Sequence, residues 1–362
     1  MYTKTDTHYM NLALKLAEKG RGSTSPNPMV GAVIVRDGEI IGKGYHRRFG
    51  SKHAEIIALQ EAGKNARDAT LYVTMEPCCH QGKTPPCTEA IVKSGINRVV
   101  TATIDINPVV HGNGIRILRN NNIETVIGVL EKQSQKLNEA YMKFIQTGLP
   151  FLTLKLAITL DGKTADMNRK SKWITGEKTR KRVHLLRSWS DAVMVGVGTV
   201  IADNPMLNVR EVKGTSPLRV IIDSKVRTPL DALVLSDTHV IIAATTEVDE
   251  KKVTLLAEQG IEVWKFDSAH GCVPLSEVLK KLGKRNITSL FCEGGPTLAG
   301  SLLHEKLVDK IIFAVAPKIL GKGYNAVESL DIEKLEDALY LNDTEYETIG
   351  DDILITGYPD YR

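Results

Sequence analysis

The 362-residue sequence has few aromatic residues and no long apolar run. Phe, Trp and Tyr make up only 5% of it, which argues against an aromatic-lined channel for single-stranded nucleic acid. No apolar run approaches the roughly 18 residues of a membrane span, and the N-terminal stretch lacks the apolar core of a signal peptide. We therefore expect a soluble, unexported, cytoplasmic protein.

Cysteine is also scarce, and its distribution is uneven. Cys78, Cys79 and Cys87 fall within ten residues, while Cys272 and Cys292 stand alone. An odd, clustered set of this kind argues against a disulfide framework. It favours metal ligation in a reducing compartment.

The net charge is small, at +4, but it is not evenly spread. Residues 1–149 carry 19 basic and 13 acidic side chains, a net +6, and the remainder carries −2. An excess of this size suits a phosphorylated small substrate and falls short of a basic stripe. We expect a small-molecule substrate, with no nucleic-acid or membrane partner.

The length favours two domains, and the first half has the pattern of an α/β layer sandwich. Apolar spacing predicts a helix over 6–19 with Gly20 as its C-terminal cap, and Asp37-Gly38 predicts a hairpin turn between two strands. Helical and strand-like stretches then alternate over 53–62, 70–75, 87–94, 98–104, 112–120 and 123–129.

The domain boundary is expected between residues 149 and 150. A polar helical stretch ends there at Gly148 and Pro150, and an apolar strand begins at 151. Residues 150–362 again alternate, which predicts a second α/β domain. Its expected strands are 191–197, 218–223, 239–244, 287–292, 311–316 and a final pair around Asp351-Asp352, with helices over 250–258 and 296–306.

A zinc site is predicted from His53, Cys78 and Cys87. His53 opens a helical pattern, and the two cysteines flank a loop that follows a predicted strand. One imidazole and two thiolates leave the fourth tetrahedral position open, as in catalytic zinc sites. Glu55, two residues from His53, would move protons rather than bind the metal, as in zinc deaminases.

A closed structural zinc site is the alternative for this cluster. Cys79 adjoins Cys78 and cannot easily reach the same metal, but His80 could supply a fourth ligand. Eight residues separate the ligand cysteines, in place of the two of the usual P-C-x-x-C pattern. This loop also holds Gly82 and Lys83, whose polar groups could recognise a substrate or could simply face solvent.

The first half resembles the bifunctional riboflavin-biosynthesis deaminase/reductases. The strings that carry the resemblance are TSPNPMVGAVIV, GYHRRFGSKHAE and VTMEPCCHQGKTPPC, and the long loop ending in TPPC sets that family apart from cytidine, tRNA-adenosine and dCMP deaminases. The resemblance implies a cytidine-deaminase-like α/β/α sandwich with zinc on His53, Cys78 and Cys87 and with Glu55 as acid/base. It also implies substrate contacts from Asn27, His46, Ala54, His80 and Lys83.

The second half extends the resemblance across nearly the whole chain through KLAITLDGKTA, SKWITG, RVIIDSKVRTPL and FCEGGPTLAGSLL. It implies a dihydrofolate-reductase-like α/β domain that uses NADPH. The implied reactions are deamination of a diamino-ribosylamino-pyrimidinone phosphate and then reduction of its ribosyl unit to ribityl. Association into a homo-oligomer is also implied.

The implied contacts of the reductase half fall into two sets. Those to the phosphorylated sugar are Ser171, Arg187, Leu207, Arg210 and Glu293. Those to NADPH are Ile158, Trp173, Thr199, Asp203, Ser224, Gly295, Pro296, Thr297 and Leu298. On sequence alone, either arginine could instead form a surface ion pair, and Trp173 could belong to the core.

Several residues of this half also indicate binding of a phosphorylated cofactor without reference to the family. FCEGGPTLAG predicts a helix that begins at Pro296, where unpaired N–H groups favour a phosphate, although a tight turn would give the same pattern. Gly196-Val197-Gly198 lacks the third glycine of the dinucleotide fingerprint.

Ser224, with Lys225 and Arg227 nearby, suits a 2′-phosphate and so favours NADPH over NADH. Lys155 and Asp203 are candidates for contacts near the reduced carbon.

Two other functions stay open on the sequence. One is a tRNA or other nucleobase deaminase with an accessory nucleotide-binding domain. The other is a structural zinc module joined to a regulatory nucleotide-binding domain without catalysis.

Overall fold

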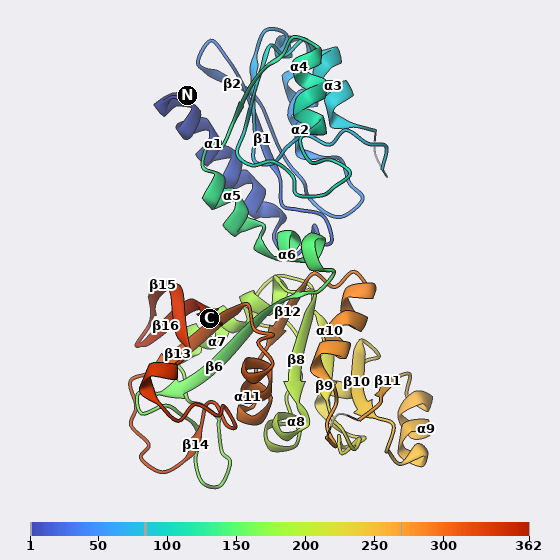
Figure 1. The fold of residues 1–362 in the computed structure, drawn as a ribbon, viewed down its shortest axis with the longest axis vertical. Helices are drawn as coiled ribbons and strands as arrows, with labels where there is room; N and C mark the ends of the chain where they lie inside the picture. The colour runs from blue at the N-terminus through green and yellow to red at the C-terminus, as the bar shows by residue number, and fades with distance from the viewer. Residues whose placement is uncertain (1, 83–84, 269, 362) are drawn as a thin grey trace. The chain divides into compact units, whose positions relative to one another are not determined.

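The computed structural model describes residues 2–82, 85–268 and 270–361, and it divides the chain into two compact units, Met1–Gly148 and Leu149–Arg362 (Figure 1). Within the described residues, no helix is both long enough and apolar enough to cross a membrane. Each unit has its own sheet and its own core.

The sheet of the first unit has the strand order β2-β1-β3-β4-β5. β1 is antiparallel to β2 and β3, whereas β3, β4 and β5 are parallel. The predicted hairpin turn is confirmed, because Asp37 and Gly38 both have a positive φ between β1 and β2. The strands are β1 Gly31–Arg36, β2 Glu39–Tyr45, β3 Thr70–Val73, β4 Arg98–Thr101 and β5 Glu124–Ile127.

Helices cover both faces of this sheet, which makes the unit an α/β/α sandwich (Figure 1). Alternate residues of β1 enter the two cores. Ala32 and Ile34 pack with α2 (Ala54–Ala62), α3 (Cys87–Ser94) and α4 (Asn113–Asn120). Val33 and Val35 pack with α1 (Lys4–Ala17) and α5 (Glu131–Leu137).

Two local features differ from the sequence pattern. Gly20 is not a left-handed helix cap, since α1 ends at Ala17 and a 3₁₀ turn follows. Glycine is needed there because a Cβ would lie 2.6 Å from the His46 carbonyl oxygen. The polar stretch before the boundary divides at Asn138 into α5 and α6 (Glu139–Thr147), because the Asn138 side chain bonds the backbone of Met29.

The sheet of the second unit has the strand order β11-β10-β9-β8-β12-β6-β13-β16-β15. The strands from β11 to β13 in this order are parallel, and β16 and β15 are antiparallel additions at one edge. A short ladder pairs β7 (Lys163–Ala165) with β14 (Tyr324–Asn325). The strands of the sheet are β6 Phe151–Thr159, β8 Ala192–Gly196, β9 Leu218–Ile222, β10 Val240–Thr245, β11 Glu262–Phe266, β12 Ser289–Cys292, β13 Lys310–Ala316, β15 Tyr340–Ile349 and β16 Asp352–Asp360.

The helices of this unit also lie in two layers (Figure 1). One core joins the sheet to α10 (Leu275–Lys284) and α11 (Pro296–His304). The other joins it to α7 (Glu177–Ser188), α8 (Val197–Asp203) and α9 (Glu250–Glu258). Pro296 is the first residue of α11, as the sequence predicts.

Asp6 ties α1 to the sheet of the first unit. Its buried carboxylate accepts hydrogen bonds from the backbone N–H and hydroxyl of Thr3 and from the Tyr72 hydroxyl. Two guanidinium nitrogens of Arg98, in β4, donate to it at 2.7 and 3.2 Å. Burial works to raise the pKa of Asp6, but Arg98 and Thr3 outweigh it and hold that pKa well below its usual range.

We predict that Asp6→Asn lowers the free energy of unfolding of the first unit by about 2 kcal/mol, because it removes the buried charged partner of Arg98 and leaves only the exposed Glu124. The wild-type advantage is present above an unfolded-state pKa of about 4 and is lost as the pH falls below it, since the folded-state pKa is depressed. Urea unfolding followed by circular dichroism measures the change.

Tryptophan fluorescence supplies the control, since Trp173, Trp189 and Trp264 all lie in the second unit. The fluorescence transition should not move in Asp6→Asn. Glu124→Gln, which removes the exposed partner of Arg98, should change stability by less than about 0.5 kcal/mol. Equal effects of the two substitutions would contradict this account.

Candidate active sites

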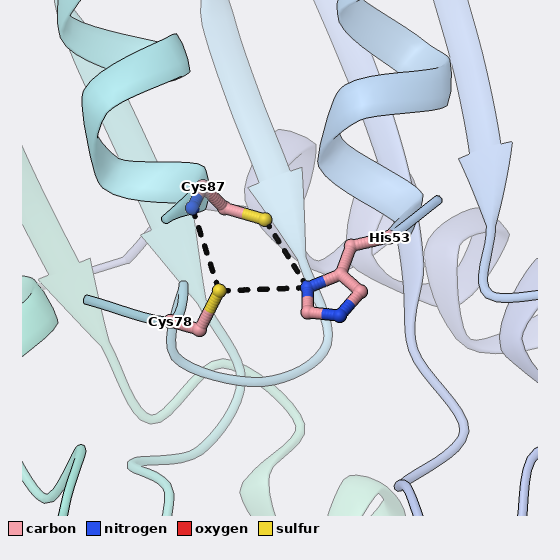
Figure 2. A group of neighbouring side chains, drawn as sticks. All are labelled: His53, Cys78 and Cys87. Atoms are coloured by element: carbon pink, nitrogen blue, oxygen red, sulfur yellow. Dashed lines mark hydrogen bonds between the residues drawn. The ribbon is translucent and has the colours of Figure 1, made fainter. Parts of the chain in front are cut away.

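Three predicted metal ligands converge in the first unit (Figure 2). His53 is the N-cap of α2, Cys87 is the first residue of α3, and Cys78 lies in the loop after β3. His53 Nδ1 lies 3.4 Å from Cys78 Sγ and 3.3 Å from Cys87 Sγ. The three ligand atoms lie within 4.8 Å of one another, so a single ion can reach them all.

The surroundings of Cys78 favour its thiolate, whereas the neighbouring Cys78 and burial raise the pKa of Cys87. The Cys87 thiol, the His53 imidazole and the backbone N–H of Cys87, 3.4 Å from Cys78 Sγ, lower the pKa of Cys78. The starts of α2 and α3 add the positive ends of two helix dipoles. One imidazole and two sulfur atoms with no carboxylate form a donor set that fits zinc rather than magnesium or calcium.

Glu55 lies in the first turn of α2, two residues after the ligand His53, and is 3% exposed. Burial, followed by the negative charge of Cys78, raises the pKa of Glu55 to about 7. A carboxyl group with this pKa can both accept and give a proton near neutral pH. Its position and protonation suit a proton shuttle.

Predicted substrate residues surround the cluster. The His46 ring lies edge-on to His53 with 5.3 Å between centroids, and Asn27 Nδ2 lies 3.3 Å from His46 Nε2. Burial lowers the pKa of His46, which favours the neutral ring. Ala54 is fully buried between His53 and Glu55.

The loop between the two cysteines is described only in part. His80 is exposed, and among the described residues neither His80 nor Cys79 belongs to the ligand cluster. Cys79 Sγ instead faces the Val109 carbonyl at 3.8 Å. Lys83, predicted to contact the substrate, lies outside the described residues.

Glu76 is a site residue that the sequence analysis missed. Its buried carboxylate accepts hydrogen bonds from the backbone N–H groups of Asp105, Gly112 and Ile115, at 2.8 to 3.2 Å. A Cβ on Gly114 would lie 2.2 Å from the Pro77 carbonyl oxygen, so only glycine allows this contact. Glu76 therefore fixes the segment that carries Cys78 against the start of α4.

The predicted residues of the second unit gather where parallel strands end. β8 and β12 are neighbours and lead into α8 and α11, with Gly196 and Gly295 as N-caps. The Gly196 N–H donates to the Gly294 carbonyl at 3.1 Å, so the two helix starts lie side by side. A Cβ on Gly295 would lie 3.3 Å from Thr199 Oγ1. The glycines leave room at this edge of the sheet, and the N–H groups at the two helix starts have no partner within their own helices. Such an edge fits the pyrophosphate of a dinucleotide.

Arg187 and Glu293 form a largely buried ion pair beside these helix starts. The Nε and Nη2 atoms, which form one edge of the guanidinium, donate to the two carboxylate oxygens, with Arg187 Nη2 2.9 Å from Glu293 Oε2. Arg187 also donates to the Asn208 carbonyl at 3.2 Å. The surface ion pair that the sequence left open for Arg187 is therefore wrong: the pair exists but is buried, and it holds the segment of Leu207 and Arg210.

The remaining predicted residues of this unit lie at the same strand ends. Leu207 is buried with a φ of 54°, and Arg210 is exposed and donates to Asn208 Oδ1. Ser171 Oγ donates to Asp203 Oδ1 at 2.6 Å. Trp173 is 58% exposed, which excludes a core role. Ile158 lies near the end of β6, and Ser224 follows β9 together with the exposed Lys225 and Arg227. In α11, the Thr297 hydroxyl donates to the Glu328 carboxylate, and Leu298 is buried.

Lys155 lies in β6 near this ion pair. Burial lowers the pKa of Lys155, and the negative charge of Glu293 acts in the opposite direction. The lysine is a candidate for a contact near the reacting carbon.

Comparisons with known proteins cover both units. Residues 3–103 match the cytidine and deoxycytidylate deaminase zinc-binding region, and residues 150–355 match the RibD C-terminal domain. The riboflavin biosynthesis protein RibD of Aquifex aeolicus is 44% identical over 356 residues, covering 98% of this chain and 99% of the relative. RibD of Escherichia coli is 40% identical over 365 residues, covering 97% and 98%.

Solved structures agree over the full length. RibD of Acinetobacter baumannii superposes with a TM-score of 0.89 at 39% identity, covering 99% of both chains. A diaminohydroxyphosphoribosylaminopyrimidine deaminase/5-amino-6-(5-phosphoribosylamino)uracil reductase from Thermotoga maritima gives 0.87 at 38%, covering 98% of this chain and 99% of that one. The predicted two-part α/β fold is confirmed by these matches.

We predict that Cys87→Ser lowers zinc affinity by at least about 100-fold, because it removes a thiolate ligand. Cys79→Ser and His80→Ala are the matched controls, and both should keep the wild-type zinc content after dialysis. Atomic absorption measures the metal. Zinc loss in His80→Ala equal to that in Cys87→Ser would show that the site is closed by a fourth protein ligand.

Proposed function

The chain belongs to the RibD family of bifunctional riboflavin-biosynthesis enzymes, and on that premise we propose which residues carry each of its two reactions. It is a zinc-dependent deaminase and an NADPH-dependent reductase. We assign the deaminase to residues 1–149 and the reductase to residues 150–362. The observation that carries the deaminase assignment is the convergence of His53, Cys78 and Cys87 beside the buried Glu55.

The first reaction deaminates 2,5-diamino-6-ribosylamino-4(3H)-pyrimidinone 5′-phosphate. When bound to His53, Cys78 and Cys87, zinc supplies a Lewis acid that makes water a nucleophile at neutral pH. Glu55 takes protons from the attacking water and passes them to the ring nitrogen and to the departing amino group. A C–O bond replaces the bond between the ring carbon and its exocyclic amino nitrogen, and ammonia leaves.

The pocket around Glu55 orients the ring. Asn27 and the neutral His46 offer a polar edge next to the ligand cluster, and Ala54 keeps the wall beside Glu55 apolar. His80 and Lys83, in the long loop between the cysteines, are assigned to the phosphorylated side of the substrate. The net positive charge of residues 1–149 supports an anionic substrate.

The second reaction reduces the ribosyl group to ribityl and gives 5-amino-6-ribitylaminouracil 5′-phosphate. NADPH, when bound, supplies the hydride. We assign Ser171, Arg187, Leu207, Arg210 and Glu293 to the sugar phosphate, with Lys155 and Asp203 near the reacting carbon. The buried Arg187–Glu293 pair supports this, because it fixes the segment that presents Arg210.

The cofactor contacts follow the ends of the parallel strands. The starts of α8 and α11, with Thr199 and residues Gly295 to Leu298, are assigned to the pyrophosphate. Ser224, with Lys225 and Arg227, is assigned to the 2′-phosphate. Ile158 and Trp173 are assigned to the remainder of the dinucleotide.

We also propose that the protein works in the cytoplasm as a homo-oligomer. Thiolate ligands support a reducing compartment. The homo-oligomer is what the resemblance to the family implies. A monomer mass in light scattering would contradict the oligomer.

Two substitutions should separate the two activities. We predict that Glu55→Gln lowers ammonia release by at least about 100-fold and leaves zinc content and the reduction of the deaminated intermediate unchanged. Arg210→Gln should raise the KM for that intermediate about tenfold in NADPH oxidation, because one phosphate contact is lost, and should leave ammonia release unchanged.

Arg210 is exposed, so Arg210→Gln should fold as the wild type does. Normal ammonia release from Glu55→Gln would remove the proposed proton shuttle. Unchanged kinetics in Arg210→Gln would remove that residue from the sugar-phosphate site and leave the deaminase assignment intact.

A further inference from the structure

The segment from Ser171 to Gly176 is held by side chains from several elements. Lys318, which follows β13, donates from Nζ to the carbonyls of Trp173 and Ile174 at 3.0 and 2.6 Å. At its ends, Ser171 bonds Asp203 in α8, and the Gly176 N–H donates to Asp352 Oδ2 in β16 at 2.7 Å. The backbone around Trp173 is therefore fixed by side chains from distant parts of the sequence.

Arg180, in the first turn of α7, contacts this segment in two ways at once. Its Nη1 donates to the Thr175 carbonyl at 2.9 Å, and its guanidinium carbon lies 4.6 Å from the centroid of the Trp173 ring. A planar guanidinium can stack on an indole while its edge donates a hydrogen bond, whereas a lysine ammonium cannot stack in this way. Arg180 thus fixes both the backbone and the ring orientation.

The indole held in this way is available to a ligand. Trp173 keeps 58% of its surface exposed, although a large apolar ring in solvent gains nothing for the fold. An aromatic ring that is exposed and oriented in advance is typical of a binding site, because little conformational freedom is lost when the ligand packs on it.

We propose that Arg180 is a positioning residue of the NADPH site, which orients the Trp173 indole to pack against a planar ring of the bound dinucleotide. The proposal rests on the proposed function, in which Trp173 contacts NADPH. Lys318 supports the same arrangement from the other side of the segment through the two carbonyls.

The direct test is the Kd for NADPH in the full-length protein, measured by the quenching of tryptophan emission. Arg180→Lys keeps the charge and loses the stacking, and Arg180→Gln keeps a donor for Thr175 and loses the charge. We expect each to raise the Kd for NADPH about fivefold. Lys318→Met, at an exposed position, should raise it in the same direction.

A second readout needs no cofactor. The fluorescence anisotropy of Trp173, obtained by subtracting the signal of Trp173→Phe, should fall in Arg180→Lys because the ring gains freedom of rotation. Arg182→Lys is the matched control, since Arg182 lies in the same helix and its guanidinium carbon lies 5.3 Å from the centroid of another tryptophan, Trp189. It should leave the Kd for NADPH unchanged.

The outcomes distinguish a failure of the positioning role of Arg180 from a failure of the cofactor assignment of Trp173. If Trp173→Phe weakens NADPH binding and the Arg180 variants do not, Trp173 contacts the cofactor but Arg180 does not position it, and the proposal is wrong. If Trp173→Phe binds NADPH as the wild type does, the cofactor assignment of Trp173 fails as well. Equal losses of NADPH and sugar-phosphate binding in the Arg180 variants would indicate general damage and would also overturn the proposal.

Discussion

Backbone N–H groups at helix starts, which have no partner within their own helix, are the feature on which both sites depend. In the first unit, α2 follows its N-cap His53 and α3 begins at Cys87, and the two starts lie next to Cys78, in the loop after β3. In the second unit, α8 and α11 begin side by side at the ends of β8 and β12. Each pair of helix starts favours negative charge, which we assign to a thiolate in the first unit and to the pyrophosphate of NADPH in the second.

The surrounding packing keeps these starts in place. Glu76 fixes the Cys78 segment by accepting hydrogen bonds from the loop before α4 and from the helix start itself. The Arg187–Glu293 pair does the same for the segment that carries Arg210. In both cases a largely buried carboxylate positions a residue assigned to a site, which is the zinc ligand Cys78 in the first unit and the proposed sugar-phosphate contact Arg210 in the second.

The sequence predicts the local features well, because they depend on neighbouring residues. The Asp37-Gly38 turn, the start of α11 at Pro296 and the ligand set of His53, Cys78 and Cys87 can all be found by short motifs. The role of Gly20 could not be predicted, since it depends on the carbonyl of His46, far away in the sequence. The position of β12 between β8 and β6 likewise depends on pairing between distant segments.

Three helices of the second unit, α7, α8 and α10, are absent from the predictions, and the reasons differ between α10 and α7. α10 has apolar residues at 275, 278, 279 and 282, a spacing that is itself sufficient to predict a helix. α7 is mostly charged, so its helical pattern is weak, and its importance lies in long side chains such as Arg180 and Arg187 that reach other elements. Such contacts are set by the tertiary fold.

The central claim is that one chain performs two reactions in a fixed order. The most direct test gives the purified protein its diamino-ribosylamino-pyrimidinone phosphate and measures ammonia, first without NADPH and then after NADPH is added. The account predicts ammonia release without NADPH, followed by NADPH oxidation in equal amount. Ammonia that appears only when NADPH is present, or NADPH oxidation before any ammonia is released, would contradict it.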